Sequence, residues 1–100
     1  MKIIKKAICG SLESSDILII ISPNENNGIE IDLNSIVLKT FGKAITKTIY
    51  EILDEYHVKD AEILINDKGA TDFVIRARLK TALYRASDEK FDWSKEVGNV

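Results

Sequence analysis

Three serines and two acidic residues lie within the eight residues CGSLESSD, from Cys9 to Asp16. A turn before a buried strand requires polar residues, but it does not require this many hydroxyl groups. No adjacent base, Gly-x-Ser-x-Gly elbow or glycine-rich phosphate loop accompanies the serines. A serine here is therefore a better candidate for covalent modification by another enzyme than for a self-activated catalytic nucleophile. Local chemistry does not separate Ser11, Ser14 and Ser15, and a plain serine-rich turn is the competing interpretation.

Other polar residues carry weaker functional signals. The single histidine, His57, falls at the end of a predicted helix, where its position suits the helix dipole and no catalytic partner is evident. Asp67, Lys68 and Asp72 surround a glycine, but their spacing does not match a calcium loop and is typical of a strand-to-helix turn. The single cysteine, Cys9, cannot form an internal disulfide.

Two further groups could contact a partner. Four basic residues of the predicted second helix form either a docking patch or an ordinary solvated face; they are Arg76, Arg78, Lys80 and Arg85. Phe91 and Trp93 lie in a short polar tail, which either folds back over the domain or is anchored to a partner through Trp93.

The composition is that of one ordinary globular domain. The 100 residues are 45% hydrophobic and 30% charged, and the formal net charge is −2. This charge balance suggests neither a nucleic acid nor an anionic membrane as partner. Lysines interrupt the apolar residues of the N-terminus and no segment has the length of a transmembrane span, so a cytoplasmic protein is expected.

Hydrophobic periodicity predicts four strands. They are expected over 3–9, 16–22, 29–34 and within 58–67. The run ILIII in the second strand indicates burial on both faces and hence a central position. The turn signal before Gly28 predicts that the second and third strands form an antiparallel hairpin.

Two helices complete the predicted fold. The first should begin after a cap at Asn34 or Ser35 and the second after a cap at Thr71 or Asp72. Their inward faces are read from steps of three and four residues: Val37, Phe41, Ile45, Ile49, Ile52 or Leu53 and Tyr56 in the first, and Ile75, Leu79, Ala82, Leu83 and Ala86 in the second. The order β-β-β-α-β-α predicts an α+β fold: a single two-layer domain with a mainly antiparallel sheet covered by two helices.

Four blocks of the chain together resemble the acyl carrier protein, or gamma chain, of citrate lyase. GSLESSD matches that family's Gly-[Ser/Thr]-Leu-Glu-Ser-Gly-Asp turn, and NSIVLKTFGKAI matches its Asn-Ser-x-Val-x-x-x-Phe-Gly-x-Ala-Ile segment. DKGATD with RARLKTALYRAS, and the short tail with Trp93, are similar to its later blocks. The resemblance covers nearly the whole chain and implies a carrier domain over 1–87 with a C-terminal tail over 88–100.

The resemblance also implies a site and a cofactor. The family's modified serine corresponds to Ser14, which would hold a phosphodiester-linked phosphoribosyl-dephospho-CoA group with a pantetheine thiol, absent from a recombinant sample lacking the attachment enzymes. Ser15 stands where the family has glycine, and the register of Glu13 and Asp16 favours Ser14 over Ser15. These two acidic residues could help a modifying transferase to recognise the turn.

The implied protein is a non-catalytic subunit of a lyase used in citrate fermentation. Its arm would hold acetyl and citryl groups as thioesters while citrate is cleaved to acetate and oxaloacetate. The implied partners are the alpha subunit, a CoA-transferase, the beta subunit, a citryl-carrier lyase, and the prosthetic-group transferase. No metal, nucleic acid or membrane is expected.

Three alternatives remain open. The carrier subunit of malonate decarboxylase uses a similar group on a similar serine turn, although Leu-Glu before Ser14 and the Phe-Gly segment favour citrate lyase. An unmodified α+β binding or regulatory module would have an unmodified mass in its native host. A self-sufficient enzyme would require a convergent nucleophile and base, and the sequence shows no such pair.

Overall fold

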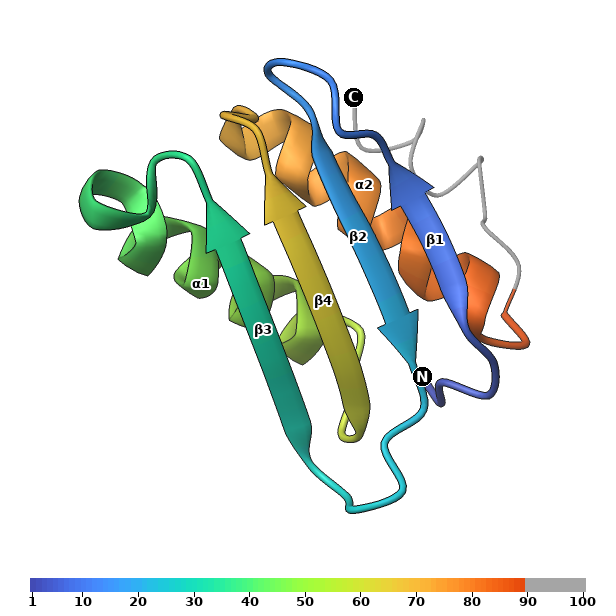
Figure 1. The fold of residues 1–100 in the computed structure, drawn as a ribbon. Helices are drawn as coiled ribbons and strands as arrows, with labels where there is room; N and C mark the ends of the chain where they lie inside the picture. The colour runs from blue at the N-terminus through green and yellow to red at the C-terminus, as the bar shows by residue number, and fades with distance from the viewer. Residues whose placement is uncertain (90–100) are drawn as a thin grey trace.

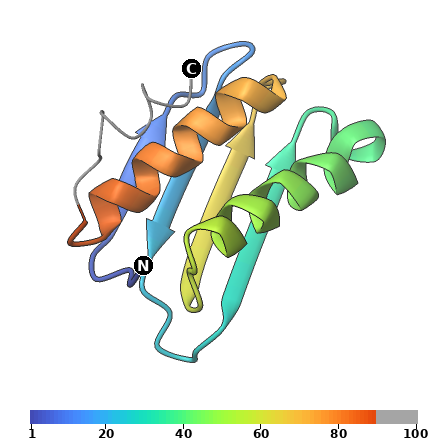
Figure 2. The ribbon, with the colours of Figure 1, turned by 180° about the vertical axis from the view of Figure 1, so that it is seen from behind.

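The structure is a computed structural model that describes residues 1–89, and the predicted tail residues Phe91 and Trp93 lie outside them. Its elements follow the predicted order β-β-β-α-β-α. They are β1 (Ala7–Gly10), β2 (Ile17–Ser22), β3 (Ile29–Ser35), α1 (Leu38–Glu55), β4 (Ala61–Asp67) and α2 (Asp72–Ala86). Both helices lie on one side of a four-stranded sheet, so the predicted two-layer α+β domain is confirmed (Figures 1 and 2).

The strands are ordered β1-β2-β4-β3 across the sheet. β2 pairs antiparallel with both β1 and β4, so its predicted central position is confirmed, whereas β3 pairs parallel with β4. The predicted β2–β3 hairpin is therefore wrong, because β4 lies between these strands. The crossover through α1 returns β4 parallel to β3, and β4 buries Ala61, Ile63 and Ile65 while the matching side chains of β3 are only half-buried.

The segment between β2 and β3 passes the start of β4 and is held there by hydrogen bonds. The Gly28 amide donates to Asp60 Oδ1 at 2.6 Å, and the Gly28 carbonyl accepts from the Ala61 amide at 3.0 Å. Asn24 Nδ2 also donates to the Gly28 carbonyl, at 3.0 Å. This segment is thus a bridge across the strand that separates β2 from β3, and not a hairpin turn.

The two helices start differently from each other. α2 begins as predicted, because Thr71 Oγ1 accepts a hydrogen bond from the Val74 amide. α1 begins after Val37 with no side-chain cap, so the predicted caps at Asn34 and Ser35 are wrong: both residues belong to β3. Ser35 Oγ instead accepts from the Val37 amide and donates to Asp67 Oδ2.

The core lies between the helices and the inner face of the sheet. All five residues predicted to face inward on α2 are buried, and Ile45, Ile49, Ile52 and Leu53 are buried on α1. Phe41 is an exception: it lies in the first turn of α1 and is 54% exposed. Within residues 1–89, neither helix is long and apolar enough to cross a membrane.

Candidate functional site

The serine-rich segment forms the turn that joins β1 to β2. The Asp16 amide donates to the Glu13 carbonyl at 3.1 Å, which makes Glu13–Asp16 a β-turn with Ser14 and Ser15 at its two central positions. Ser15 has a φ of 64°, the left-handed conformation that favours glycine at the third position of a turn. The glycine of the Glu-Ser-Gly-Asp motif therefore corresponds to the turn position with positive φ.

The structure separates Ser11 from the other two serines of the turn. Ser11 is structural, because its Oγ donates to Asp16 Oδ2 at 2.7 Å and accepts from the Glu13 amide at 3.2 Å. Ser14 and Ser15 are exposed, and within residues 1–89 no hydrogen bond engages either hydroxyl. Two of the three hydroxyls are thus accessible for modification, and Ser11 is occupied.

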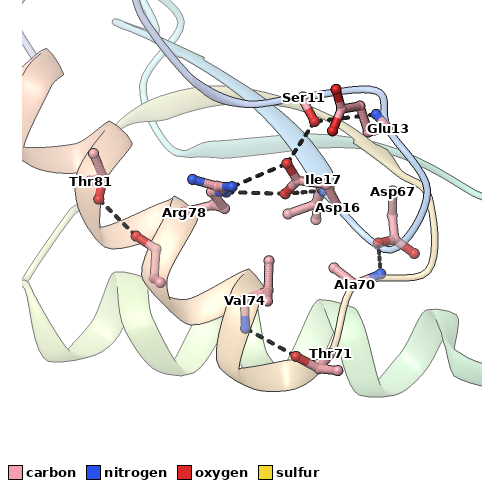
Figure 3. A network of polar contacts seen from close by, with 11 residues as sticks. Ser11, Glu13, Asp16, Ile17, Asp67, Ala70, Thr71, Val74, Arg78 and Thr81 are labelled. Carbon is pink, nitrogen blue, oxygen red and sulfur yellow. Dashed lines mark hydrogen bonds and ion pairs between the residues drawn. The ribbon is translucent and has the colours of Figure 1, made fainter.

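Asp16 holds the turn to α2. Its two carboxylate oxygens accept from Arg78 Nε and Nη2, both at 3.1 Å, and Oδ1 also accepts from the Ile17 amide at 2.8 Å (Figure 3). The hydrogen bond from Ser11, and then those from Arg78, lower the pKa of Asp16 to about 2. Asp16 is only 15% exposed, because its carboxylate is engaged by Ser11, the Ile17 amide and Arg78.

A second contact joins the turn to the loop between β4 and α2. The Ser15 amide donates to the Lys68 carbonyl at 2.8 Å, and the Lys68 amide donates to the Asp16 carbonyl at 2.9 Å. That loop is itself held by the buried Asp67, whose carboxylate accepts from Ser35 Oγ at 2.7 Å and from the Ala70 amide at 2.9 Å. The backbone around Ser14 is therefore held from two sides while the Ser14 side chain remains exposed.

Gly10 allows the turn to close tightly. Its φ of 96° lies in the left-handed region, and a Cβ at this position would clash with the Ile17 carbonyl. A side chain at position 10 would thus push apart the two strand ends that carry the turn.

The basic residues of α2 do not form one free patch. Arg76 pairs with Asp72 at 2.7 Å and with Glu51 at 2.8 Å, Arg78 binds Asp16, and Arg85 donates to the Ile8 carbonyl at 2.8 Å. Three of the four basic residues predicted as either a docking patch or a solvated face are therefore used within the domain, and the fourth, Lys80, forms no ion pair within residues 1–89.

The loop around Gly69, His57 and Cys9 have the structural positions that the sequence suggests for them. Asp67 and Gly69 form a strand-to-helix turn, with Gly69 at a φ of 90°, and residues 1–89 contain no acidic, histidine or cysteine cluster that could hold a metal. His57 follows the C-terminus of α1, as predicted. Cys9 is a buried free thiol.

Sequence reasoning missed the ion pair between Asp16 and Arg78. The two residues are 62 positions apart, and neither helical nor strand periodicity links them. The available signals were local: an acidic residue at the end of a polar turn, and an arginine next to the apolar inward face of a helix.

Comparison with known proteins places the chain in a family. A family model described as "Malonate decarboxylase delta subunit (MdcD)" matches residues 4–86. The citrate lyase acyl carrier protein of Treponema denticola is 49% identical over 89 residues, covering 89% of this chain and all of that protein. Those of Yersinia enterocolitica and Haemophilus ducreyi are 48% and 47% identical, covering 90% and 95% of this chain and 93% and 98% of theirs.

A solved structure shows the same fold. A chain of a Pseudomonas malonate decarboxylase hetero-tetramer in complex with malonate superposes with a TM-score of 0.64 at 20% sequence identity, over 83% of this chain and 84% of that chain. The family model and the solved structure carry the name of malonate decarboxylase, whereas the relatives at 47–49% identity over nearly the whole chain are citrate lyase acyl carrier proteins. The chain belongs to the citrate lyase acyl carrier protein family.

Proposed function

We propose that the chain is the acyl carrier subunit of citrate lyase and that Ser14 is the attachment point of its prosthetic group. The observation that carries this proposal is an exposed serine hydroxyl, without a hydrogen-bond partner among residues 1–89, on a turn whose conformation is fixed by other residues. The citrate lyase acyl carrier proteins that match nearly the whole chain at 47–49% identity support it.

Two features favour Ser14 over Ser15. Glu13 and Asp16 flank the pair in the register of the family motif, which assigns the modified serine to position 14. Ser15 occupies the positive-φ position of the turn, where the motif has glycine and no side chain is needed. Ser14 lies at the other central position and is not among the residues with positive φ.

The turn suits a bulky phosphodiester-linked group such as phosphoribosyl-dephospho-CoA. Adding it at Ser14 would break no hydrogen bond of residues 1–89, since Ser11, Asp16 and Lys68 hold the backbone. When bound, the group supplies a thiol that carries the acyl residue as a thioester. The chain's own contribution is positioning: a braced turn at one end of the sheet keeps Ser14 accessible and raises the effective concentration of the arm near the enzyme sites.

An acyl carrier acts only together with the enzymes that load it and use its acyl group. We infer that the alpha subunit, a CoA-transferase, and the beta subunit, a citryl-carrier lyase, act on the loaded carrier, that a separate transferase loads it, and that the complex is cytoplasmic. The carrier contributes no catalytic group. The division into a carrier domain over 1–87 and a tail over 88–100 with Trp93 stays a prediction.

Two alternative functions can be distinguished from a citrate lyase carrier, one by the enzyme with which the chain assembles and the other by the mass of the chain. A malonate decarboxylase carrier is supported by the family model over residues 4–86, but it has the weaker support overall, because the solved structure of that enzyme shares only 20% identity with the chain, against 47–49% for the citrate lyase carriers. An unmodified binding module would carry no adduct.

Intact mass and peptide mapping test the proposal on protein purified with its complex from citrate-fermenting cells of the native host. We expect the prosthetic-group mass on the peptide that contains Ser14, and co-purified subunits with citrate lyase activity. An unmodified peptide in an active complex would overturn the carrier function. Decarboxylation of malonate by the same complex would favour the malonate decarboxylase alternative.

A further inference from the structure

One face of the sheet is left uncovered by the described elements. Both helices pack on the opposite face, and Figure 1 looks onto the open one. Because side chains alternate along each strand, the residues between the core positions point to this face. We call this surface the open face; it consists of the residues of the four strands whose side chains point away from the helices.

The centre of the open face is apolar. Ile8, Ile20 and Leu64 are Cα partners across β1, β2 and β4, and Leu18 is the next outward residue of β2. Ile8 is 49% exposed and Leu64 is 51% exposed, while Leu18 and Ile20 are half-buried by their neighbours. Four contiguous apolar side chains on a sheet face that residues 1–89 leave uncovered are typical of an interaction surface.

The margin on the β3 side of this apolar centre is acidic. Glu62 of β4 is the Cα partner of Glu30 of β3, and Leu64 is the partner of Asp32. The three carboxylates line an open hollow of about 350 Å³ beside Ser22 and Leu64. No residue within 1–89 forms an ion pair with any of them, and the four strands contain no lysine or arginine.

We propose that the open face is the surface by which the carrier docks on an enzyme subunit of its complex. The contacting surface of that subunit would be apolar, with lysine or arginine side chains entering the hollow between Glu30, Asp32 and Glu62. This inference rests on the proposed carrier function. It assigns the docking partner by its chemistry and names the residues that recognise it.

Charge argues against a second copy of this chain as the occupant. Packing two open faces together would oppose strands that carry carboxylates and no cations, so the acidic margins would find no partner in each other. An enzyme surface with basic side chains satisfies both the apolar centre and the acidic margin.

The position of the open face also suits a carrier. Gly10 and Leu18 form the last Cα pair of β1 and β2 before the turn that carries Ser14. Docking through the centre of the sheet would therefore hold the domain while leaving the turn, at the edge of the interface, free to present Ser14.

Assembly of the full-length carrier with purified citrate lyase alpha and beta subunits tests this docking surface. The variants are the double charge reversal Glu30→Lys with Glu62→Lys, and separately Leu64→Asn. The matched controls are Glu25→Lys with Glu55→Lys, which reverse exposed charges elsewhere, and Phe73→Asn, an 81% exposed apolar residue on α2. Circular dichroism of each variant establishes that it is folded.

We expect the open-face variants to weaken assembly at least tenfold, and the controls to change it less than twofold. Binding of the wild type should also weaken as salt is raised, because the charge contacts are screened. Unchanged assembly of the folded open-face variants, or equal loss in the controls, would overturn the proposal, as would a carrier homodimer that the same variants dissociate.

The Ser14 adduct, measured by mass on the same samples, separates the two proposals. An adduct with unchanged assembly overturns the docking surface alone. A missing adduct in an active wild-type complex overturns the carrier function, and the docking proposal with it.

Discussion

Arg78 of α2 binds the carboxylate of Asp16 through Nε and Nη2, each at 3.1 Å, across 62 residues of sequence. This pair joins the turn that carries Ser14 to the helix layer. The turn thus takes its conformation from the folded domain, and Ser14 can be exposed without the turn being loose.

Replacing Arg78 should change how stability depends on pH. The folded-state pKa of Asp16 is about 2, below the ordinary value of 3.8, so its contribution is present above pH 3.8 and is lost as the pH falls towards 2. In Arg78→Gln we expect lower stability at pH 6 and a shallower fall of the unfolding free energy between pH 4 and 2. Urea unfolding at several pH values measures both quantities.

Arg85→Gln is the control for this change, because within residues 1–89 Arg85 donates only to the Ile8 carbonyl, and this variant should keep the wild-type pH slope. Equal slopes for Arg78→Gln and the wild type would mean that Arg78 does not lower the pKa of Asp16.

Ser15→Gly should stabilise the domain. A left-handed conformation costs a residue with a Cβ about 1–2 kcal/mol, and the extra freedom of glycine in the unfolded chain offsets about 0.5–1 kcal/mol of that gain. We therefore expect a net increase of about 0.5–1 kcal/mol in unfolding free energy, with the prosthetic-group adduct retained.

Ser14→Gly offers the comparison within the same turn, because Ser14 lacks a positive φ and should gain nothing from glycine. A loss of the adduct in Ser15→Ala, with Ser14 intact, would move the attachment point to position 15.

Gly10→Ala should strongly destabilise the domain. The new Cβ would meet the Ile17 carbonyl in addition to the strain of a φ of 96°, and we expect a loss of about 3 kcal/mol. Gly28→Ala is a matched control, since its φ of 89° imposes similar strain but no atom lies within 4 Å of the added Cβ. Thermal unfolding should show a clearly larger drop for Gly10→Ala, and equal drops would contradict the predicted clash.

Ser14→Ala should remove the adduct and leave the fold intact. Ser14 is exposed and its hydroxyl has no partner within residues 1–89, so the unfolding free energy should change by less than about 0.5 kcal/mol. Mass spectrometry of the complex from the native host should show an unmodified carrier, and citrate cleavage should be abolished. An active complex containing this variant would exclude Ser14 as the attachment point.

Hydrophobic periodicity predicted the buried face of most elements correctly, but it did not predict which strands are neighbours in the sheet. The alternation of Ala61, Ile63 and Ile65, and the spacing of the inward residues of α2, each identified the buried side. The same patterns do not specify which strand pairs with which, so the turn signal at Asn27-Gly28 predicts a hairpin although β4 lies between β2 and β3. Phe41 has the helical spacing of the buried residues of α1, but in the first turn of that helix its side chain is exposed.

At the candidate site, the turn, its serines and the family can be recognised from the amino-acid sequence, because they depend on residue types that are close together or in ordered blocks. The folded domain is needed to see that Ser11 is structural, that Asp16 is held by Arg78 and that Lys68 holds the backbone of the turn. The contact between Ser11 and Asp16 lies within the turn, but the contacts of the turn with Lys68 and Arg78 join segments that are about fifty residues or more apart in the chain. These contacts form only when β1, β2, β4 and α2 pack together. The open face has the same origin, since its apolar and acidic residues become neighbours through the register of β1, β2, β4 and β3.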